Sequence, residues 1–410
     1  MPIFRGWLIV GSLFVVLMVS SGLGFYTLPI LVRVMSEQGV FSVHDVSSAS
    51  AIFFLASGIA GLKIARLLEK NDVRWVVTGG GILCGFCLWG LGQIQQAYEL
   101  YAIYAIFGIG FAATSLLPAM TVITRWFVAK RAIAISIAST GLSVGGVLVA
   151  PQVAGWVETF GFREVSIWLG VAYMAGTVPL TWLFIVGKPE SLGLSPDGER
   201  EASVRTPKNG SNIEYKNAVT SSFFVWFSIT YIFVMAAQVG GMIHIYNLVA
   251  FRIDAEYARW IMGVTALASI TGRFAGGFLL HHVSIKPVTY VLILVQGIAL
   301  VGLATVWEPF WMTGLAVAFG LSVGNILMIQ PLILAETFGV KDYGRIFAVS
   351  QLLTTIGYAM GPEIMGAMFD YFGGYRNAFS LLGLFCFVGL VFFCIANMKG
   401  SSCRRSRLLG

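Results

Sequence analysis

One arginine inside an apolar run is the residue of this sequence with the clearest chemical meaning. Arg273 stands within the run 265–280, and no Asp or Glu occurs between Tyr257 and Leu280. A guanidinium offers a planar fork of N–H groups that can bind a carboxylate through two parallel hydrogen bonds. Arg273 is therefore interpreted as an anion-binding residue. The alternative is an arginine that bonds backbone carbonyls, or a glutamate on a neighbouring helix, and only locks the bundle.

Two titratable residues near the outer ends of apolar runs are candidates for proton coupling. Glu363 follows Gly361-Pro362, and a buried carboxylate there could carry a proton. The alternative is a glutamate at a helix end that reaches water. His244 could respond to pH near neutrality, or it could be a hydrogen-bonded histidine at the membrane interface.

Five polar residues in the middle of apolar runs are candidates for orienting a substrate. Each of them could instead bond a neighbouring helix, an interaction that contributes about 0.6 kcal/mol in membranes. These residues are Tyr26, Ser115, Gln238, Asn325 and Tyr358.

No motif in the sequence indicates an enzyme, a cofactor or a metal site. Cys84 and Cys87 are flanked by apolar residues and Gly, which indicates a thiol pair within a membrane helix, and no second pair completes a metal site. Neither a nucleotide-binding glycine motif nor a Ser-His-Asp set occurs. We therefore expect no catalytic activity, no cofactor and no bound metal.

The composition of the chain indicates a membrane protein. Its 410 residues are 57% hydrophobic and only 11% charged, whereas soluble domains are about 45–50% apolar and about 25% charged. The net charge of +7 comes from cations in short loops between apolar runs rather than in one patch, so nucleic acid is not an expected partner.

Twelve apolar runs are long enough to cross a bilayer as helices, which predicts an all-α membrane protein embedded in lipid. The first run is longer than the core of a signal peptide, so we expect it to be retained. Most of the 26 Lys and Arg residues fall in alternate loops, which predicts that both termini are cytoplasmic. The runs are 7–31, 49–68, 73–94, 101–124, 132–157, 165–186, 223–249, 257–280, 288–306, 310–334, 346–369 and 378–396.

The two halves of the chain repeat each other at an offset of 211 residues. We therefore predict two six-helix halves, 1–186 and 218–398, joined by a cytoplasmic linker at 187–217 and followed by a basic tail at 399–410, with a substrate path between the halves. The linker is expected to be a solvated tether. The matching pairs are Gly61 and Gly272, Phe127 and Phe338, Lys130 and Lys341, Gly146 and Gly357, Pro151 and Pro362, and Gly155 and Gly366.

Glycine pairs spaced four residues apart predict close helix contacts. Gly141 with Gly145, and Gly357 with Gly361, expose smooth faces on which another backbone can pack. Pro151 and Pro362 follow at matching places and could bend these helices.

Several short motifs resemble those of the major facilitator superfamily, and in particular its monocarboxylate porter and oxalate/formate antiporter groups. The resemblance implies a twelve-helix fold and transport by alternating access, with the position of Arg273 binding a carboxylate. The motifs are RGW at 5–7, GFYTLP at 24–29, RWFVAKR at 125–131 before the glycines of 141–146, PESLGLSPDG at 189–198 and ETFG at 336–339.

The sequence also departs from the patterns of these groups. Ile30 follows the proline of the first run where monocarboxylate porters often have Lys. Ser269 stands four residues before Arg273, where they often have Asp. Ala65 occupies the place of the usual Asp in the loop motif after the second run, and His281-His282 stand where Asp-Arg would be expected in the second half.

We therefore expect a secondary active transporter in the cell membrane that moves a small organic anion, in particular a monocarboxylate. Transport could be coupled to protons as symport or to a counter-anion as antiport. The alternatives are efflux of an amphiphilic compound and, on the same fold, a receptor or sensor that binds a ligand without moving it.

Overall fold

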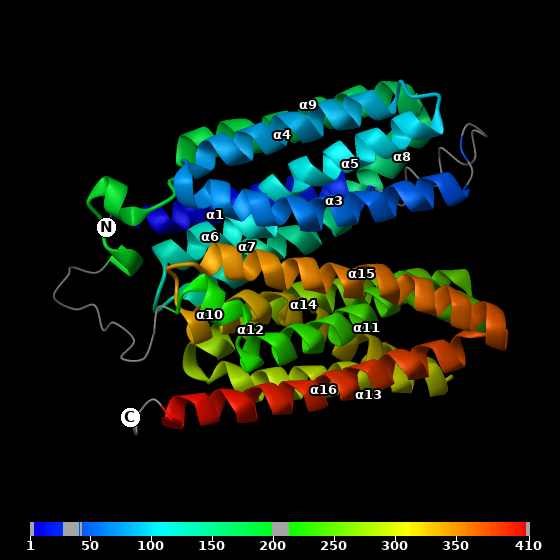
Figure 1. The fold of residues 1–410 in the computed structure, drawn as a ribbon. Helices are drawn as coiled ribbons and strands as arrows, with labels where there is room; N and C mark the ends of the chain where they lie inside the picture. The colour runs from blue at the N-terminus through cyan, green and yellow to red at the C-terminus, as the bar shows by residue number, and fades with distance from the viewer. Residues whose placement is uncertain (1–3, 28–40, 42, 199–212, 407–410) are drawn as a thin grey trace. The chain divides into compact units, whose positions relative to one another are not determined.

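A computed structural model describes residues 4–27, 41, 43–198 and 213–406, and helices are the only regular secondary structure among them (Figure 1). The chain divides into two compact units. The first unit comprises Met1–Gly210 with Tyr343–Ala348, and the second comprises Ser211–Asp342 with Val349–Gly410. The boundary near residue 210 lies within the predicted linker.

The helices of the first unit include two short π-helical and two short 3₁₀ segments. They are α1 (Arg5–Val19), η1 (Ser20–Phe25), α3 (Val43–Lys70), α4 (Val73–Leu91), α5 (Ala97–Thr114), α6 (Leu116–Trp126), α7 (Arg131–Val144), η2 (Gly145–Val149), α8 (Ala150–Phe160), α9 (Phe162–Phe184), η3 (Pro189–Leu192) and η4 (Pro196–Gly198).

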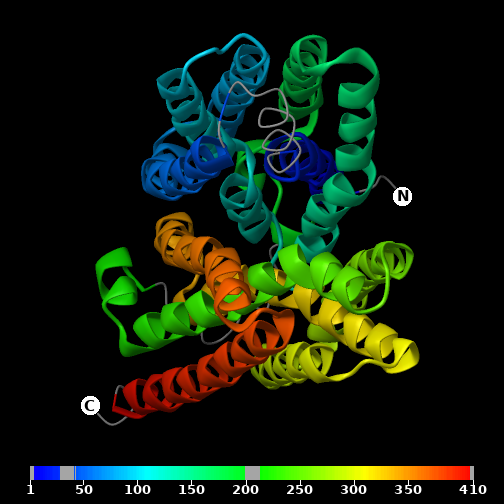
Figure 2. The ribbon, with the colours of Figure 1, turned by 90° about the vertical axis from the view of Figure 1, so that its right-hand side faces the viewer.

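The second unit is built mainly of long helices. They are α10 (Tyr215–Val219), α11 (Ser222–Arg252), α12 (Ala255–His282), α13 (Ile285–Thr305), α14 (Pro309–Phe338), α15 (Tyr343–Phe372) and α16 (Tyr375–Ser406). The C-terminal helix α16, red in Figures 1 and 2, packs along α11 and α13.

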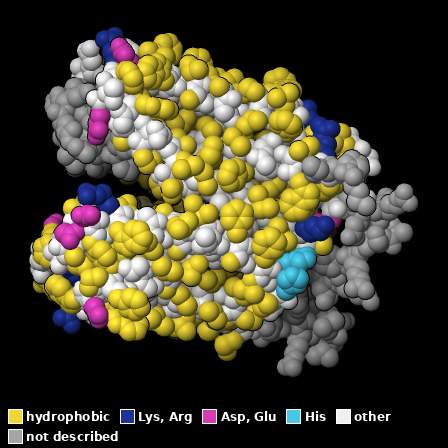
Figure 3. Space-filling model, turned by 180° about the vertical axis from the view of Figure 1, so that it is seen from behind, with side chains coloured by type: hydrophobic (Ala, Val, Ile, Leu, Met, Phe, Trp, Pro, Cys, Tyr) yellow, Lys and Arg dark blue, Asp and Glu magenta, His cyan; other side chains and the backbone are white. Residues whose placement is uncertain are grey.

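The predicted all-α membrane fold is confirmed. Eleven helical segments of the described residues are long and apolar enough to cross a bilayer. The remaining predicted run, 346–369, corresponds to α15, which is equally long but carries more polar residues, among them Gln351 and Glu363. Hydrophobic side chains cover the flanks of the units, and charged side chains gather at the helix ends (Figure 3). Helix α16 extends to Ser406, so the first part of the predicted tail is helical.

Three of the predicted continuous runs are interrupted, which is a correction to the sequence analysis. The run 101–124 divides into α5 and α6 at Ser115, whose φ of −99° and ψ of −149° are not helical. The runs 7–31 and 132–157 contain the π-helical segments η1 and η2. Such segments are rare and wind the helix more widely than an α-helix, and both of these contain two glycines.

The two π-helical segments pack on each other within the first unit. Gly22 of η1 lies against Gly145 and Val149, so that a Cβ atom at Gly22 would collide with both. The hydroxyl of Ser21 donates to the carbonyl of Leu142 at 3.0 Å. The two irregular turns therefore form one contact between the first and fifth predicted spans.

The predicted glycine contacts are confirmed in both units. Gly141 faces the carbonyl of Phe14 on α1. In the second unit, Gly357 faces the carbonyl of Ile232 and Gly361 faces that of Ala236, both on α11. These glycines allow two helix backbones to touch without intervening side chains.

The first part of the predicted linker is docked on the first unit. The Asp197 carboxylate accepts hydrogen bonds from three successive backbone N–H groups, those of Val128 (2.9 Å), Ala129 (2.7 Å) and Lys130 (3.2 Å). These groups lie just before α7, where a helix amino end favours negative charge. The residues that suggested a solvated tether, from Glu199 to Lys208, lie outside the described residues.

Replacing Gly357 by Ala is expected to lower thermal stability, because its Cβ would press on the backbone of α11. Overpacking of this kind costs about 1–3 kcal/mol. Gly366 on the same helix has open space where its Cβ would lie, so Gly366→Ala is the matched control. The melting temperature of each purified variant in detergent provides the measurement, and equal values for the two would contradict this packing.

Replacing Asp197 by Ala is expected to loosen the docked part of the linker. Three backbone donors would lose their acceptor, and loss of a comparable helix cap costs about 1 kcal/mol. Limited proteolysis should cleave the 187–198 region faster in Asp197→Ala than in wild type. Asp197→Asn, which keeps one acceptor oxygen, should be intermediate. Identical cleavage rates in all three proteins would show that the carboxylate does not hold this segment.

Candidate functional site

Arg273 lies on α12 and is almost fully buried, with 3% of its surface exposed. Its Nε donates to the carbonyl of Gly324 on α14 at 2.9 Å. This bond directs the Nε side of the guanidinium toward the backbone of α14. The alternative considered from the sequence, an arginine that bonds a backbone carbonyl, is therefore present in the structure. This bond does not exclude the binding of an anion by Arg273.

Glycines on both helices bring α12 and α14 into direct backbone contact around Arg273. On α14, Gly320 faces the carbonyl of Thr265 and Gly324 faces that of Ser269. On α12, Gly272 faces the backbone of Leu321. A side chain at Gly324 would also meet Cγ of Arg273. The missing Cβ atoms therefore allow the arginine stem to cross α14 and reach its backbone.

Asn325, the residue after Gly324, also connects α14 to α12. Its Nδ2 donates to the carbonyls of Gly272 (2.9 Å) and Leu321 (2.8 Å), so these two acceptors fix which end of the amide is nitrogen. Its Oδ1 occupies the space where a Cβ atom of residue 276 would lie, which Gly276 leaves open. This oxygen has no hydrogen-bond partner in the described part of the chain. Asn325 therefore cross-links the two helices beside Arg273, which is the helix-bonding role considered in the sequence analysis.

Ser269 is a buried residue of this site that the sequence analysis noted only as a departure. It lies one helical turn before Arg273 on α12, so both side chains share a face of that helix. Only 5% of its surface is exposed, and within the described ranges its Oγ has no hydrogen-bond partner. The four-residue spacing from Arg273 was the signal that pointed to this position.

Gln238 and Tyr358 lie on other helices of the second unit. Gln238 is buried on α11, which packs beside α12, and its Oε1 has no partner among the described residues. Tyr358 is half-buried on α15 and lies near Tyr231, whose hydroxyl donates to the carbonyl of Ile326 on α14 at 3.0 Å.

The two candidates for proton coupling lie close to each other but differ in burial. His244 is half-buried on α11, beside the carbonyl of Pro362 and with its ring centroid 5.8 Å from that of Tyr375. Glu363, the next residue on α15, is exposed. An exposed carboxylate fits a glutamate that reaches water better than a buried proton carrier.

Ser115 and Tyr26 lie in the first unit. Ser115 is half-buried at the break between α5 and α6. Tyr26 follows η1, is half-buried, and packs its ring over Gly146. The structure therefore brings Arg273, Asn325 and Ser269 together, whereas these two residues belong to the other compact unit.

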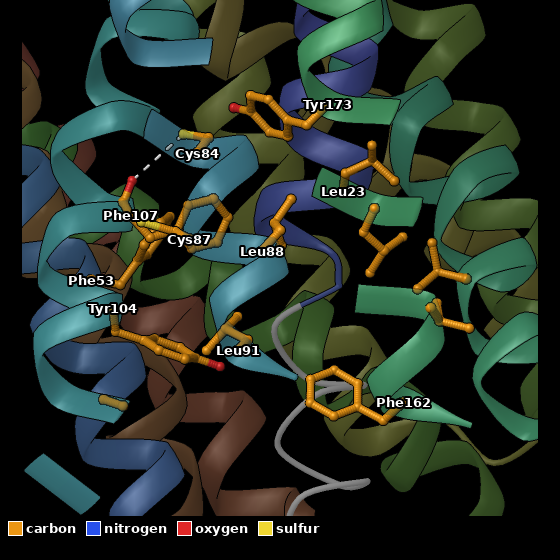
Figure 4. Close-up of a cluster of buried hydrophobic side chains, with 14 of the residues drawn as sticks. Leu23, Phe53, Cys84, Cys87, Leu88, Leu91, Tyr104, Phe107, Phe162 and Tyr173 are labelled. Atoms are coloured by element: carbon orange, nitrogen blue, oxygen red, sulfur yellow. Dashed lines mark hydrogen bonds between the residues drawn. The ribbon is translucent and has the colours of Figure 1, made fainter. Parts of the chain in front are cut away.

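The first unit contains a buried polar cluster that the sequence analysis missed. The hydroxyl groups of Thr114 and Tyr173 are 2.7 Å apart, and Tyr173 donates to Ser20 at 3.0 Å. Figure 4 shows the Tyr173 hydroxyl directed toward Cys84, whose Sγ donates to the Phe107 carbonyl. These groups satisfy one another across η1, α4, α5 and α9, so they hold the unit together rather than offering free donors.

A comparable cluster occupies the equivalent helices of the second unit. Gln296 on α13 donates to the carbonyl of Val234 (3.0 Å) and to Sγ of Cys386 (3.4 Å), and accepts from Ser322 (3.5 Å). Its members lie on α11, α13, α14 and α16, which are the first, third, fourth and sixth spans of the predicted second half.

The cysteine pair of α4 has no metal-binding partners among the described residues. Cys84 and Cys87 are free and buried, and no group of three or more His, Cys, Asp or Glu residues that could hold a metal ion occurs in the described ranges.

Comparisons with known proteins identify the family. The chain matches the family model described as Major Facilitator Superfamily over residues 13–324 and again over 240–401. Monocarboxylate transporter 11 of Mus musculus is 24% identical over 94% of this chain and 87% of its own length. The MFS transporter asaE of Aspergillus flavus is 24% identical over 85% of this chain and 76% of its own length.

A solved structure shares the fold. The major facilitator transporter FucP in its outward conformation superposes with a TM-score of 0.69, covering 97% of this chain and 99% of that chain at 16% sequence identity. The relatives are transporters rather than enzymes. Together with the helical fold and the matched family model, these similarities show that the chain belongs to the major facilitator superfamily of membrane transporters.

Proposed function

We propose that this transporter moves a small organic anion, a monocarboxylate, by alternating access, and that Arg273 binds the carboxylate. The observation that carries the proposal is a buried guanidinium in the middle of a membrane-spanning helix. An arginine at such depth costs about 2.5–3.5 kcal/mol on insertion scales, so its presence favours a functional role.

The surroundings of Arg273 suit an anion. Neither α11 nor the part of α12 between Tyr257 and Leu280 contains Asp or Glu. The acidic residues of α14, together with its N-cap, are Glu308 and Glu336 near its two ends. A bound carboxylate would add negative charge to this neighbourhood and could accept two parallel hydrogen bonds from the guanidinium.

The relatives support the same substrate class. Monocarboxylate transporters 11 and 13 of mammals align with more than nine-tenths of this chain at 24–25% identity. The bias of Lys and Arg toward alternate loops supports a cell-membrane protein with both termini in the cytoplasm.

Coupling to protons or exchange against a counter-anion are the two forms that transport could take. Uptake into proteoliposomes with an imposed pH gradient distinguishes them. Symport predicts uptake that follows the gradient in vesicles without internal substrate. Exchange predicts uptake that requires internal anion and is insensitive to the gradient.

Efflux of an amphiphilic compound is the second candidate, and the 31 Phe residues of the chain are compatible with it. It predicts resistance to such compounds in expressing cells and transport without a carboxylate. A receptor or sensor would bind ligand but show no flux.

Replacing Arg273 by Ala is expected to reduce carboxylate flux at low substrate concentration by about tenfold to a hundredfold. Hydrogen bonds to a charged group contribute about 1.5–3 kcal/mol, which corresponds to this range. Arg273→Lys keeps the charge but loses the fork, so it should be intermediate. Uptake of radiolabelled acetate, pyruvate and lactate into proteoliposomes provides the measurement.

Arg259→Ala is the matched control, because Arg259 lies on the same helix and is exposed. Its flux should equal that of wild type. Undiminished carboxylate flux in Arg273→Ala would refute the proposed anion site.

A further inference from the structure

Ser269 differs from the neighbouring hydroxyl residues of α12 in how its side chain is used. Thr265 donates to the carbonyl of Ile261 at 2.7 Å, and Thr271 donates to that of Leu267 at 2.9 Å. Both bonds return to the residue four positions earlier in the same helix. Ser269 is buried like Thr265, yet its hydroxyl has no hydrogen-bond partner among the residues that the structure describes.

An unused buried hydroxyl has an energetic cost. A buried polar group without a partner costs about 1–3 kcal/mol, and the large majority of such groups in proteins have partners. A hydroxyl in a helix can remove this cost by bonding its own backbone, as both threonines do. Among the described residues, the Ser269 hydroxyl forms no such bond and could therefore accept a partner from outside the protein.

The position of Ser269 indicates what this partner is. It lies one turn from Arg273 on the same face of α12. Gly324 touches both residues, since a Cβ atom there would meet the Ser269 carbonyl and Cγ of Arg273. The Arg273 Nε is directed to the Gly324 carbonyl. The backbone of Ser269 and the side chain of Arg273 therefore both pack against Gly324.

The chemistry of a carboxylate matches this pair. A carboxylate has two oxygens and about four acceptor positions, so a guanidinium fork does not exhaust its capacity. A serine hydroxyl is neutral, and it can donate to an anion without adding charge that repels it. An Asp at the same position would place a negative charge one turn from the arginine.

We propose that the Ser269 hydroxyl is a second donor to the substrate carboxylate bound by Arg273, and that it helps set the affinity for anionic substrates. The inference rests on the proposed function and adds a residue to that site. Ser269 contributes a directional hydrogen bond, whereas Arg273 contributes the charge. Asn325 acts on both by fastening α14 to α12, and is a positioning residue.

The test measures KM and maximal rate for radiolabelled acetate, pyruvate and lactate in proteoliposomes. In Ser269→Ala we expect KM to rise about tenfold with maximal rate largely retained, because a donor to the bound anion is lost. Ser269→Thr keeps the hydroxyl and should stay close to wild type. Thr271→Ala is the matched control, since that hydroxyl is exposed and bonded to its own helix, and its KM should not change.

A double variant distinguishes direct contact with the anion from a structural effect. If both side chains bind one carboxylate, adding Ser269→Ala to Arg273→Ala should raise KM much less than Ser269→Ala does alone. Full additivity of the two effects would contradict a shared ligand. Should Ser269→Ala prove unstable, Ser269→Cys has nearly the same size and only a weak donor, and it should show the same rise in KM.

The two proposals fail in different ways. An unchanged KM in Ser269→Ala together with lost flux in Arg273→Ala would overturn the role of Ser269 and leave the anion site standing. Unchanged carboxylate transport in both variants would overturn both proposals. A lower KM in Ser269→Ala would also contradict the donor role.

Discussion

The burial of the positive charge of Arg273 inside a membrane-spanning helix is the constraint that the packing around it must satisfy. A guanidinium removed from water requires hydrogen bonds and a source of negative potential, since lipid offers neither. The Nε of Arg273 donates to the carbonyl of Gly324, and it reaches this carbonyl because α12 and α14 approach each other through glycine. The close packing of α12 against α14 and the position of the Arg273 charge therefore depend on each other.

The two units use buried polar groups differently. In the first unit, Ser20, Thr114 and Tyr173 bond one another and thereby connect helices that are far apart in sequence. In the second unit, Gln296 forms a comparable connection, but other polar atoms, those of Gln238, Ser269 and Asn325 among them, have no hydrogen-bond partner in the described part of the chain. The first unit also contains such an atom, the hydroxyl of Tyr104, so among the described residues the two units differ in degree.

Much of the architecture could be predicted from the sequence, because long apolar runs and the distribution of Lys and Arg depend on the bilayer alone. Arg273 could be identified for the same reason, as a charge where charges are rare. The close contacts of Gly357 and Gly361 with α11 followed from the four-residue spacing of small residues.

The rest depends on which helix faces which, and here the sequence carries little information. In a membrane both the lipid-facing and the protein-facing sides of a helix are apolar, so hydrophobic periodicity does not mark the buried face. The π-helical turn at Gly22 requires the neighbouring turn at Gly145, and the break at Ser115 requires its own tertiary surroundings. Asn325 could be recognised as polar, but its bonds to Gly272 and Leu321 follow only from the pairing of α12 with α14.

Binding of carboxylates to the purified protein tests the central claim most directly. Thermal stability would be measured in detergent across a panel of short monocarboxylates, for wild type and for Arg273→Ala, with uncharged amides of the same shape as controls. The account predicts that carboxylates, and not amides, raise the melting temperature of wild type in a concentration-dependent way, and that Arg273→Ala loses this response while remaining folded. Equal stabilisation of both proteins by carboxylates would contradict it.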